Sequence, residues 1–291
     1  MITVPTVLVL GAGASKEFGY PLGEDLLYEV ADGLKVKNSE FEKKLLGLGL
    51  LFGDIDLVTF GHALRYSGQP SIDAFIERRE EYYTVAQPAM ALALLQHEDV
   101  DRPFQKGANL YKYIYSCMSA PNQMEFKKNT LNVVTFNYDL SPEYFLDTAL
   151  QNSFGLSVPM QATALRLETM KIVHVHGSLT PLGDTKERLR VYGDPRIMQL
   201  WKSNVVAPTE DKITDTLVRR GQDIIKKSAS NICIPVPIMI SKDYVARYTE
   251  AHDLLTNAKR IIFLGFAYEK RNLGRLLNPS VPSAIPEEAM I

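Results

Sequence analysis

Three short clusters of polar residues carry the side chains whose types and spacing could do chemistry. They are the glycine turn at 11–15 (GAGAS), the amide and carboxyl cluster at 135–139 (TFNYD), and the imidazole cluster at 174–178 (HVHGS). Each follows a short apolar run that is typical of a buried strand. Polar groups at the carboxyl ends of parallel strands face the crevice where α/β proteins bind ligands. We therefore expect the three clusters to share one site.

The glycine turn is expected to cradle a pyrophosphate. Glycines let the backbone approach a ligand closely, and the N–H groups at the start of a helix attract phosphate. The turn departs from the dinucleotide-binding fingerprint, because Lys16 stands in place of the third glycine and no ribose-binding acid is evident about 20 residues later. The alternative, that these glycines serve only the geometry of the turn, stays open.

The second cluster places Asn137 and Asp139 two residues apart, so that in an extended segment both side chains would project to the same side. An amide and a carboxylate on one side can hold a ribose hydroxyl and a carboxamide together. The alternative is an Asx-type turn in which both side chains bond only to local backbone groups.

The third cluster contains two histidines. His176, which is followed by a glycine at a strand end, is well placed to act as a general base. His174 lies deeper in the strand, and we interpret it as a buried, hydrogen-bonded core residue. A fourth strand ends at Gly265 and Phe266, which could receive the second ribose or the adenine side of a nucleotide, or could simply form a tight turn.

The elements that must position these clusters alternate between strands and helices. Helical spacing follows the first turn at Leu22, Leu26 and Val30, and it recurs just before the last strand. This alternation predicts an α/β, Rossmann-like fold with a mainly parallel sheet and helices on both faces. The predicted strands are 6–10, 131–136, 172–175 and 261–264, with a weaker one at 234–240 that Pro235 and Pro237 disfavour.

We expect a single domain with a helical insertion. The predicted parts are a core of about 1–34, 129–181 and 232–277, a helical insertion of about 35–128, an irregular or helical segment of about 182–231, and a Pro-rich tail at 278–291.

The composition is ordinary for a soluble globular protein, with 46% hydrophobic and 23% charged residues. Lys plus Arg total 32 against 34 Asp plus Glu, so the charge gives no overall reason to expect nucleic-acid binding. Cys117 and Cys233 are far apart and have no metal-ligand spacing, which suits a reducing cytoplasm. No apolar stretch approaches the roughly 20 residues that span a bilayer. We expect a cytoplasmic protein that does not associate with membranes.

Taken together, these clusters resemble the sirtuin superfamily. They are most similar to the sirtuin-like domains that deplete NAD in bacterial antiphage defence. The resemblance covers most of the chain, in the segments VLVLGAGASKEFGYPLG (7–23), SIDAFI (71–76), VVTFNYDLSPEYFL (133–146), VHVHGSL (173–179) and IIFLGFAY (261–268).

Two departures bear on the activity that the resemblance implies. Deacetylases of the superfamily carry a four-cysteine zinc module, which two separated cysteines cannot supply, and they have Gln before the Asn where this chain has Phe136. Both departures speak against protein deacylation.

The resemblance implies an NAD+ hydrolase that releases nicotinamide and ADP-ribose, with NAD as its substrate and no metal. It further implies a gated effector of an antiphage defence system, kept inactive until a homo-oligomer or a defence partner (an ATPase, an Argonaute-like protein or a phage sensor) completes the site. Asp73 matches a recurrent position of the helical region. The implied catalytic residues are Asn137, Asp139 and His176, and the implied NAD-binding residues are Gly11, Ala12, Gly13, Ala14, Ser15, Thr135, Phe136, Gly177, Ser178, Gly265 and Phe266.

Three alternatives stay open. The chain could be a sensor that binds NAD or ADP-ribose without turnover, a scaffold subunit with a vestigial pocket, or, least favoured, a deacylase.

Overall fold

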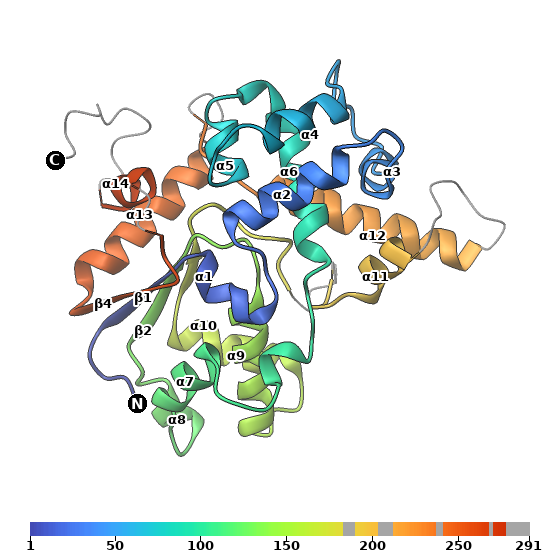
Figure 1. The fold of residues 1–291 in the computed structure, drawn as a ribbon. Helices are drawn as coiled ribbons and strands as arrows, with labels where there is room; N and C mark the ends of the chain where they lie inside the picture. Colours follow the sequence, from blue (N-terminus) through green and yellow to red (C-terminus); the bar gives the residue numbers. More distant parts are fainter. Residues whose placement is uncertain (183–189, 203–211, 237–240, 268–269, 278–291) are drawn as a thin grey trace. The chain divides into compact units, whose positions relative to one another are not determined.

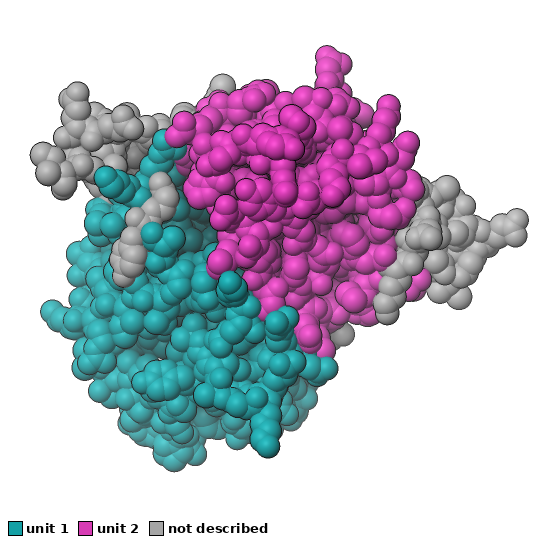
Figure 2. All heavy atoms as spheres, in the orientation of Figure 1, with its two compact units in different colours: residues 1–18, 101–177, 236–291 teal, residues 19–100, 178–235 magenta. Residues whose placement is uncertain are grey.

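The computed structural model describes residues 1–182, 190–202, 212–236, 241–267 and 270–277. Contacts within the chain form two compact units, which Figure 2 colours separately. Unit 1 comprises residues 1–18, 101–177 and 236–291, and unit 2 comprises residues 19–100 and 178–235. The chain therefore passes between units near residues 18, 100, 177 and 235, whereas the predicted helical insertion runs from about 35 to 128.

Unit 1 contains a four-stranded, all-parallel sheet with the strand order β3-β2-β1-β4 (Figure 1). Each strand is short and apolar, and β1 is buried along its whole length, as expected for a central parallel strand. The predicted α/β fold with a mainly parallel sheet is confirmed. The strands are β1 (Thr6–Leu10), β2 (Leu131–Thr135), β3 (Ile172–His174) and β4 (Arg260–Leu264).

The strand order has a reversal point at β1. From β1 the chain builds outward to β2 and β3, and it then returns to place β4 on the other side of β1. In doubly wound sheets the crevice beyond the carboxyl ends of the strands at such a reversal is where ligands bind. Leu10 pairs with Thr135 on one side and with Leu264 on the other. The glycine turn at 11–15, the cluster at 135–139 and the turn at Gly265 and Phe266 therefore begin at the same level of the sheet.

The helices of unit 1 connect and cover these strands. Helix α13 packs against β3, and α9 packs against α7 and α10. The helices are α1 (Ala12–Ser15), η1 (Lys16–Phe18), η3 (Arg102–Phe104), α7 (Leu110–Cys117), α8 (Gln123–Phe126), α9 (Ser141–Ser153), α10 (Pro159–Thr169), α13 (Lys242–Asn257) and α14 (Lys270–Leu277).

In its described residues, unit 2 is helical. Its centre is α6, which is apolar on nearly every side and therefore buried among neighbours rather than amphipathic. Helix α6 packs against α12, α2 and α3, and α2 packs against α4. The helices are α2 (Gly23–Leu34), α3 (Glu40–Gly47), α4 (Leu57–Arg65), α5 (Ile72–Ile76), η2 (Glu80–Tyr82), α6 (Tyr83–Leu95), α11 (Pro195–Lys202) and α12 (Lys212–Asn231).

One predicted strand is wrong where the structure can be compared with it. Residues 234–236 form no strand, because the two prolines of this segment remove the N–H groups that a ladder needs. The remainder of that segment, 237–240, and the predicted Pro-rich tail lie outside the described residues. In the part of the chain that is described, no helix is both long and apolar enough to cross a membrane.

Candidate functional site

The glycine turn packs directly against the turn that follows β4. The Gly11 N–H donates to the Leu264 carbonyl at 3.0 Å, and the Gly13 N–H donates to the Gly265 carbonyl at 3.0 Å. A Cβ at Gly11 would lie 2.5 Å from the Gly265 oxygen, and a Cβ at Gly13 would lie 2.8 Å from the Gly265 Cα. Glycine is thus required at both positions for the approach of one turn to the other.

This packing changes the interpretation of the turn. The amide groups of Gly11, Gly13 and Ala14 all donate to backbone carbonyls, the last to Gly11 at 2.9 Å. Amide groups engaged in this way are not available to a phosphate. Packing between the two turns thus accounts for glycine at positions 11 and 13, and the pyrophosphate cradle stays a prediction.

A hollow of about 450 Å³ nevertheless lies beside the turn. Its lining comes from the glycine turn, the start of α7 and the end of β4, and it includes the exposed cation Lys16. The residues around it are Gly13, Ala14, Lys16, Glu17, Leu110, Leu264 and Gly265. Its position at the carboxyl ends of β1 and β4 is the one that the strand order favours for a ligand.

Asn137 and Asp139 meet through Ser15. The Asn137 Nδ2 donates to the Gly11 carbonyl at 2.9 Å and to the Ser15 Oγ at 2.8 Å. The Ser15 Oγ in turn donates to the Asp139 Oδ2 at 2.7 Å. Asn137 is half-buried, whereas Ser15 and Asp139 are buried. Two of the predicted clusters therefore form one hydrogen-bonded chain, which joins the turn after β1 to the segment after β2.

Burial raises the pKa of the Asp139 carboxyl, although hydrogen bonds from Ser141 and Ser15 act in the opposite direction. The other Asp139 oxygen, Oδ1, accepts from the Ser141 N–H at 3.1 Å and also from the Ser141 hydroxyl. The Tyr111 hydroxyl lies 2.8 Å from the Ser141 Oγ. Asp139 is thus held among hydroxyl groups in a water-poor environment, where burial favours the neutral carboxyl group and the hydrogen bonds from the two serines favour the carboxylate.

His176 is buried and neutral. Its Nε2 lies 3.0 Å from the Tyr248 hydroxyl of α13, and the Phe136 ring meets it edge-on with ring centroids 5.3 Å apart. Burial lowers the pKa of His176 to about 3, and the positive charges of Arg275 and Arg247 act in the same direction. In this arrangement the imidazole is a weak base, so the predicted general-base role needs a change in its surroundings.

His174 is also buried, but it is bonded at both ring nitrogens. Its Nδ1 lies 2.8 Å from the Asn137 carbonyl oxygen, and its Nε2 lies 2.8 Å from the Glu143 Oε1 on α9. The expectation that His174 is a buried, hydrogen-bonded core residue is confirmed.

The remaining predicted residues of unit 1 frame this region. The Thr135 Oγ1 accepts from the Asn137 N–H at 3.0 Å, which fixes the start of the turn. Phe136 packs on Phe266 with ring centroids 5.0 Å apart. Gly177 has a φ of 75° and donates its N–H to the His174 carbonyl at 3.0 Å, closing a turn that only glycine adopts easily. Half-buried Ala12 is the first residue of α1.

Two predicted residues belong to unit 2. Ser178 is its first residue after β3, and its hydroxyl donates to the Leu179 carbonyl at 3.0 Å. Asp73 lies in the first turn of α5, which begins at the Ser71 cap.

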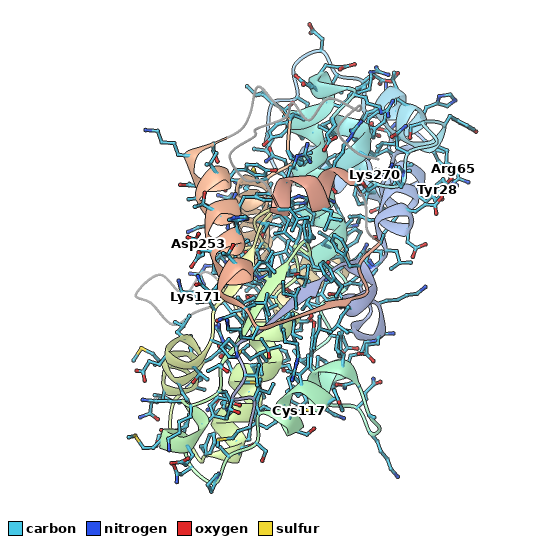
Figure 3. The ribbon with its side chains drawn as sticks, turned by 90° about the vertical axis from the view of Figure 1, so that its left-hand side faces the viewer. Tyr28, Arg65, Cys117, Lys171, Asp253 and Lys270 are labelled. Carbon is cyan, nitrogen blue, oxygen red and sulfur yellow. The ribbon has the colours of Figure 1, made fainter. Side chains whose placement is uncertain are left out.

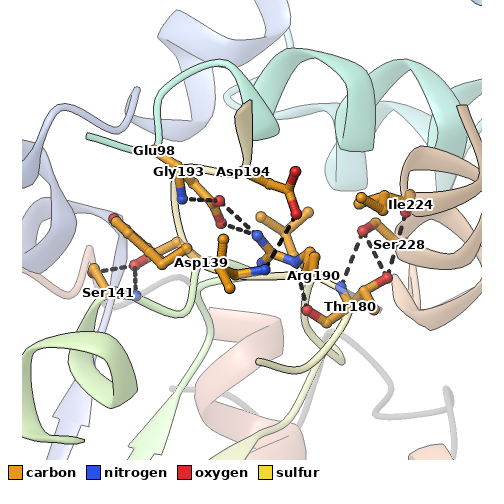
Figure 4. Close-up of polar contacts among 12 residues, drawn as sticks. Glu98, Asp139, Ser141, Thr180, Arg190, Gly193, Asp194, Ile224 and Ser228 are labelled. Carbon is orange, nitrogen blue, oxygen red and sulfur yellow. Dashed lines mark hydrogen bonds and ion pairs between the residues drawn. The ribbon is translucent and has the colours of Figure 1, made fainter. Parts of the chain in front are cut away.

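Unit 2 has a buried ion pair that the sequence did not indicate. The Arg190 Nη1 lies 2.7 Å from the Glu98 Oε1 and 2.5 Å from Oε2. The Glu98 Oε2 also accepts from the Gly193 N–H, and the Arg190 Nε donates to the Thr180 carbonyl. Figure 4 draws these contacts and also the contact between Asp139 and Ser141 in unit 1. Since both charges of the pair are buried, it fastens Arg190 to the segment that follows α6.

A second hollow of about 850 Å³ lies at the opposite, amino-terminal ends of the strands. Lys171 and Asp253, both labelled in Figure 3, line it. None of the predicted site residues lies in its wall.

Sequence reasoning missed the residues that contact the predicted side chains from a distance in the chain. Tyr248, Glu143 and Ser141 bond to His176, His174 and Asp139, respectively. Ser141 and Glu143 at the start of α9 follow the second cluster closely and could have been included. Nothing in the sequence pairs Tyr248 with a histidine 72 residues away.

Among the described residues, no group of three or more His, Cys, Asp or Glu side chains could hold a metal ion. Comparison with models of known protein families finds no match to this chain, and comparison with curated proteins finds none either.

Proposed function

We propose that this protein binds NAD+ in the crevice at the carboxyl ends of β1, β2 and β4 and cleaves its bond to nicotinamide. The observation that carries the proposal is the chain of hydrogen bonds from Asn137 through Ser15 to Asp139. It lies at the reversal point of the sheet, beside a hollow lined by Lys16. The motif resemblance to sirtuin-like NAD hydrolases supports the same substrate.

The proposed reaction needs little covalent help from the protein. Water attacks C1′ of the nicotinamide ribose, the C1′–N bond breaks, and nicotinamide leaves as a neutral molecule with the bonding electron pair. The water loses one proton, and ADP-ribose is the second product. In this scheme Asn137 orients the ribose and the water. The Asp139 carboxylate stabilises positive charge that develops on the ribose.

His176 is the proposed acceptor of the water's proton, and its environment bears on when it can act. A base works best when its pKa lies near the operating pH. At a pKa of about 3, with Tyr248 bonded to its Nε2, His176 is far from that condition.

We propose that the protein is gated and that a homo-oligomer or a defence partner moves Tyr248 away from His176. Nicotinamide release per molecule should then rise with protein concentration or on adding the partner, and a constant specific activity would contradict the gating.

The test is chromatographic detection of nicotinamide after the purified protein is incubated with NAD+, over a range of protein concentrations. His176→Ala should lower the rate by about 10²- to 10⁴-fold, the usual contribution of a general base. His62→Ala, which removes an exposed histidine of α4, is the matched control and should match the wild type. Equal rates in His176→Ala and the wild type would remove His176 from the reaction.

The second candidate is a sensor that binds NAD or ADP-ribose without turnover. The specific observation in its favour is the low basicity of buried His176. Binding of NAD+ by calorimetry, with no nicotinamide released at any protein concentration or with any partner, would favour the sensor over the hydrolase.

A further inference from the structure

His174 has a bonding pattern that fixes its protonation state by geometry. Its two ring nitrogens face the Asn137 carbonyl oxygen and the Glu143 carboxylate, each at 2.8 Å. A carbonyl oxygen and a carboxylate can only accept hydrogen bonds. Both bonds therefore exist together only when both ring nitrogens carry protons, which makes the ring an imidazolium.

We propose that the His174 imidazolium is a positioning residue that clamps the Asn137 turn in its binding conformation, and that its deprotonation releases the turn. The inference rests on the proposed function only for its effect on NAD. The clamp itself joins three elements, because His174 ends β3, Asn137 follows β2 and Glu143 lies in the first turn of α9.

The charges around the ring favour the imidazolium. Burial acts to lower the pKa of His174, but the negative charge of Glu143 and the hydrogen bond to it outweigh burial, and the pKa is raised. Asp139 acts in the same direction from the segment after β2. Glu143 is itself ionised, because burial is outweighed by the charge of His174 and by the bond to it.

Other charged groups reach this region from the neighbouring helices. Arg247 of α13, whose buried Nε has no hydrogen-bond partner among the described residues, and Arg275 of α14 act on His176, two residues from His174. On α10, the Arg166 Nε lies 2.6 Å from the Asp147 Oδ1 of α9, and the Arg166 charge also acts on Glu143. On α13, which packs against β3, Glu250 pairs with Lys171 at the far end of the strand. Among the described residues, the second Glu143 oxygen is buried with no hydrogen-bond partner, and the His174 ring contacts the first oxygen directly.

The clamp acts on the backbone of Asn137, whose side chain donates to the Gly11 carbonyl and to the Ser15 hydroxyl. A neutral ring keeps one ring proton and can hold only one of the two acceptors. Since the pKa of His174 is raised, the clamp is complete below that pKa while Glu143 is ionised, and it is lost as pH rises through the folded-state pKa. The loss of a hydrogen bond to a charged group corresponds to about 10- to 100-fold weaker binding at the site that it orders.

The experiment reads the clamp without NAD. The chain has five histidines, so ring ¹⁵N signals can be assigned by His→Gln variants and followed by NMR from pH 5 to 9.5. The His174 ring should be doubly protonated at pH 6, and the backbone amide signals of Asn137 and Tyr138 should shift at the midpoint of its titration. Glu143→Gln should move both midpoints towards acid pH. Glu29→Gln, which alters a similar His–Glu pair in unit 2, should move neither.

A neutral His174 ring at pH 6, or amide signals that ignore its titration, would overturn the clamp. The same titration followed by NAD+ calorimetry adds the functional readout. Binding should weaken above the His174 midpoint in the wild type and at lower pH in Glu143→Gln. If the NMR midpoints agree but NAD+ does not bind at any pH, the clamp stands and the proposed function fails.

Discussion

Ser15 joins the side chains of Asn137 and Asp139. Its hydroxyl accepts from Asn137 and donates to buried Asp139, so it serves both with one oxygen atom. Ser15→Ala should leave an Asp139 oxygen without its donor and cost about 1–3 kcal/mol of unfolding free energy, measured in urea. Ser116→Ala, at an exposed serine of α7, should change it by less than about 0.5 kcal/mol. Equal losses in the two variants would show that the bridge is not formed.

His176 makes the stability of the folded protein fall as the solution becomes acidic. Its pKa is lowered to about 3 in the folded state from 6.5, so the unfolded chain binds the proton first as pH falls. Stability is therefore lost between about pH 6.5 and pH 3, by up to roughly 5 kcal/mol from this group. In urea unfolding at pH 7 and pH 4.5, His176→Gln should lose less stability than the wild type between the two values. His62→Gln should behave as the wild type, and an unchanged loss in His176→Gln would contradict the buried, neutral imidazole.

At the level of elements, the site depends on two turns that approach closely. Gly265 has a φ of 59°, and a Cβ there would lie 2.1 Å from the Ala14 nitrogen. Gly265→Ala should cost about 2–5 kcal/mol, since backbone strain and overpacking add. Gly155 has almost the same φ, 60°, with nothing within 4 Å of the added atom, so Gly155→Ala should cost about 1 kcal/mol. Equal unfolding free energies for the two variants would contradict the contact between the turns.

Strands were the most predictable elements, because short apolar runs between helical patterns leave few other interpretations. The run at 6–10 was predicted with the bounds that the structure has, and those at 131–135, 172–174 and 260–264 differ from prediction by one residue at one end. What the sequence could not supply is pairing over distance. The contact of Gly13 with Gly265 and that of His176 with Tyr248 can be predicted only when the strand order is known.

Asn137 and Asp139 illustrate the same limit within the site. Their spacing predicted side chains on one side of an extended segment, but residues 136–140 form no strand. The two are joined instead through Ser15 of another cluster. The residue types indicated the site, but their spacing did not predict that Asn137 and Asp139 meet through Ser15.

At the scale of the whole molecule, unit 2 draws on a buried ion pair to hold its two chain segments. Glu98→Ala should leave the Arg190 charge buried without its partner and cost about 3–5 kcal/mol in urea unfolding. Asp32→Ala, which breaks the half-exposed pair with Arg65, should cost less than about 1 kcal/mol. A small loss in Glu98→Ala would show that the pair is open to water.

The most direct test of the central claim is the amount of nicotinamide released from NAD+ by the wild type, Asn137→Ala and Asn132→Ala. All three are compared at the protein concentration, or with the partner, that activates the wild type. Asn132 is the matched control, because it is a half-buried asparagine of β2 whose Oδ1 accepts from the Lys171 backbone N–H. We predict release by the wild type and by Asn132→Ala, and at least about a hundredfold loss in Asn137→Ala, the scale of removing a group that stabilises the transition state. Release that Asn137→Ala retains in full would contradict the assignment of catalysis to this crevice.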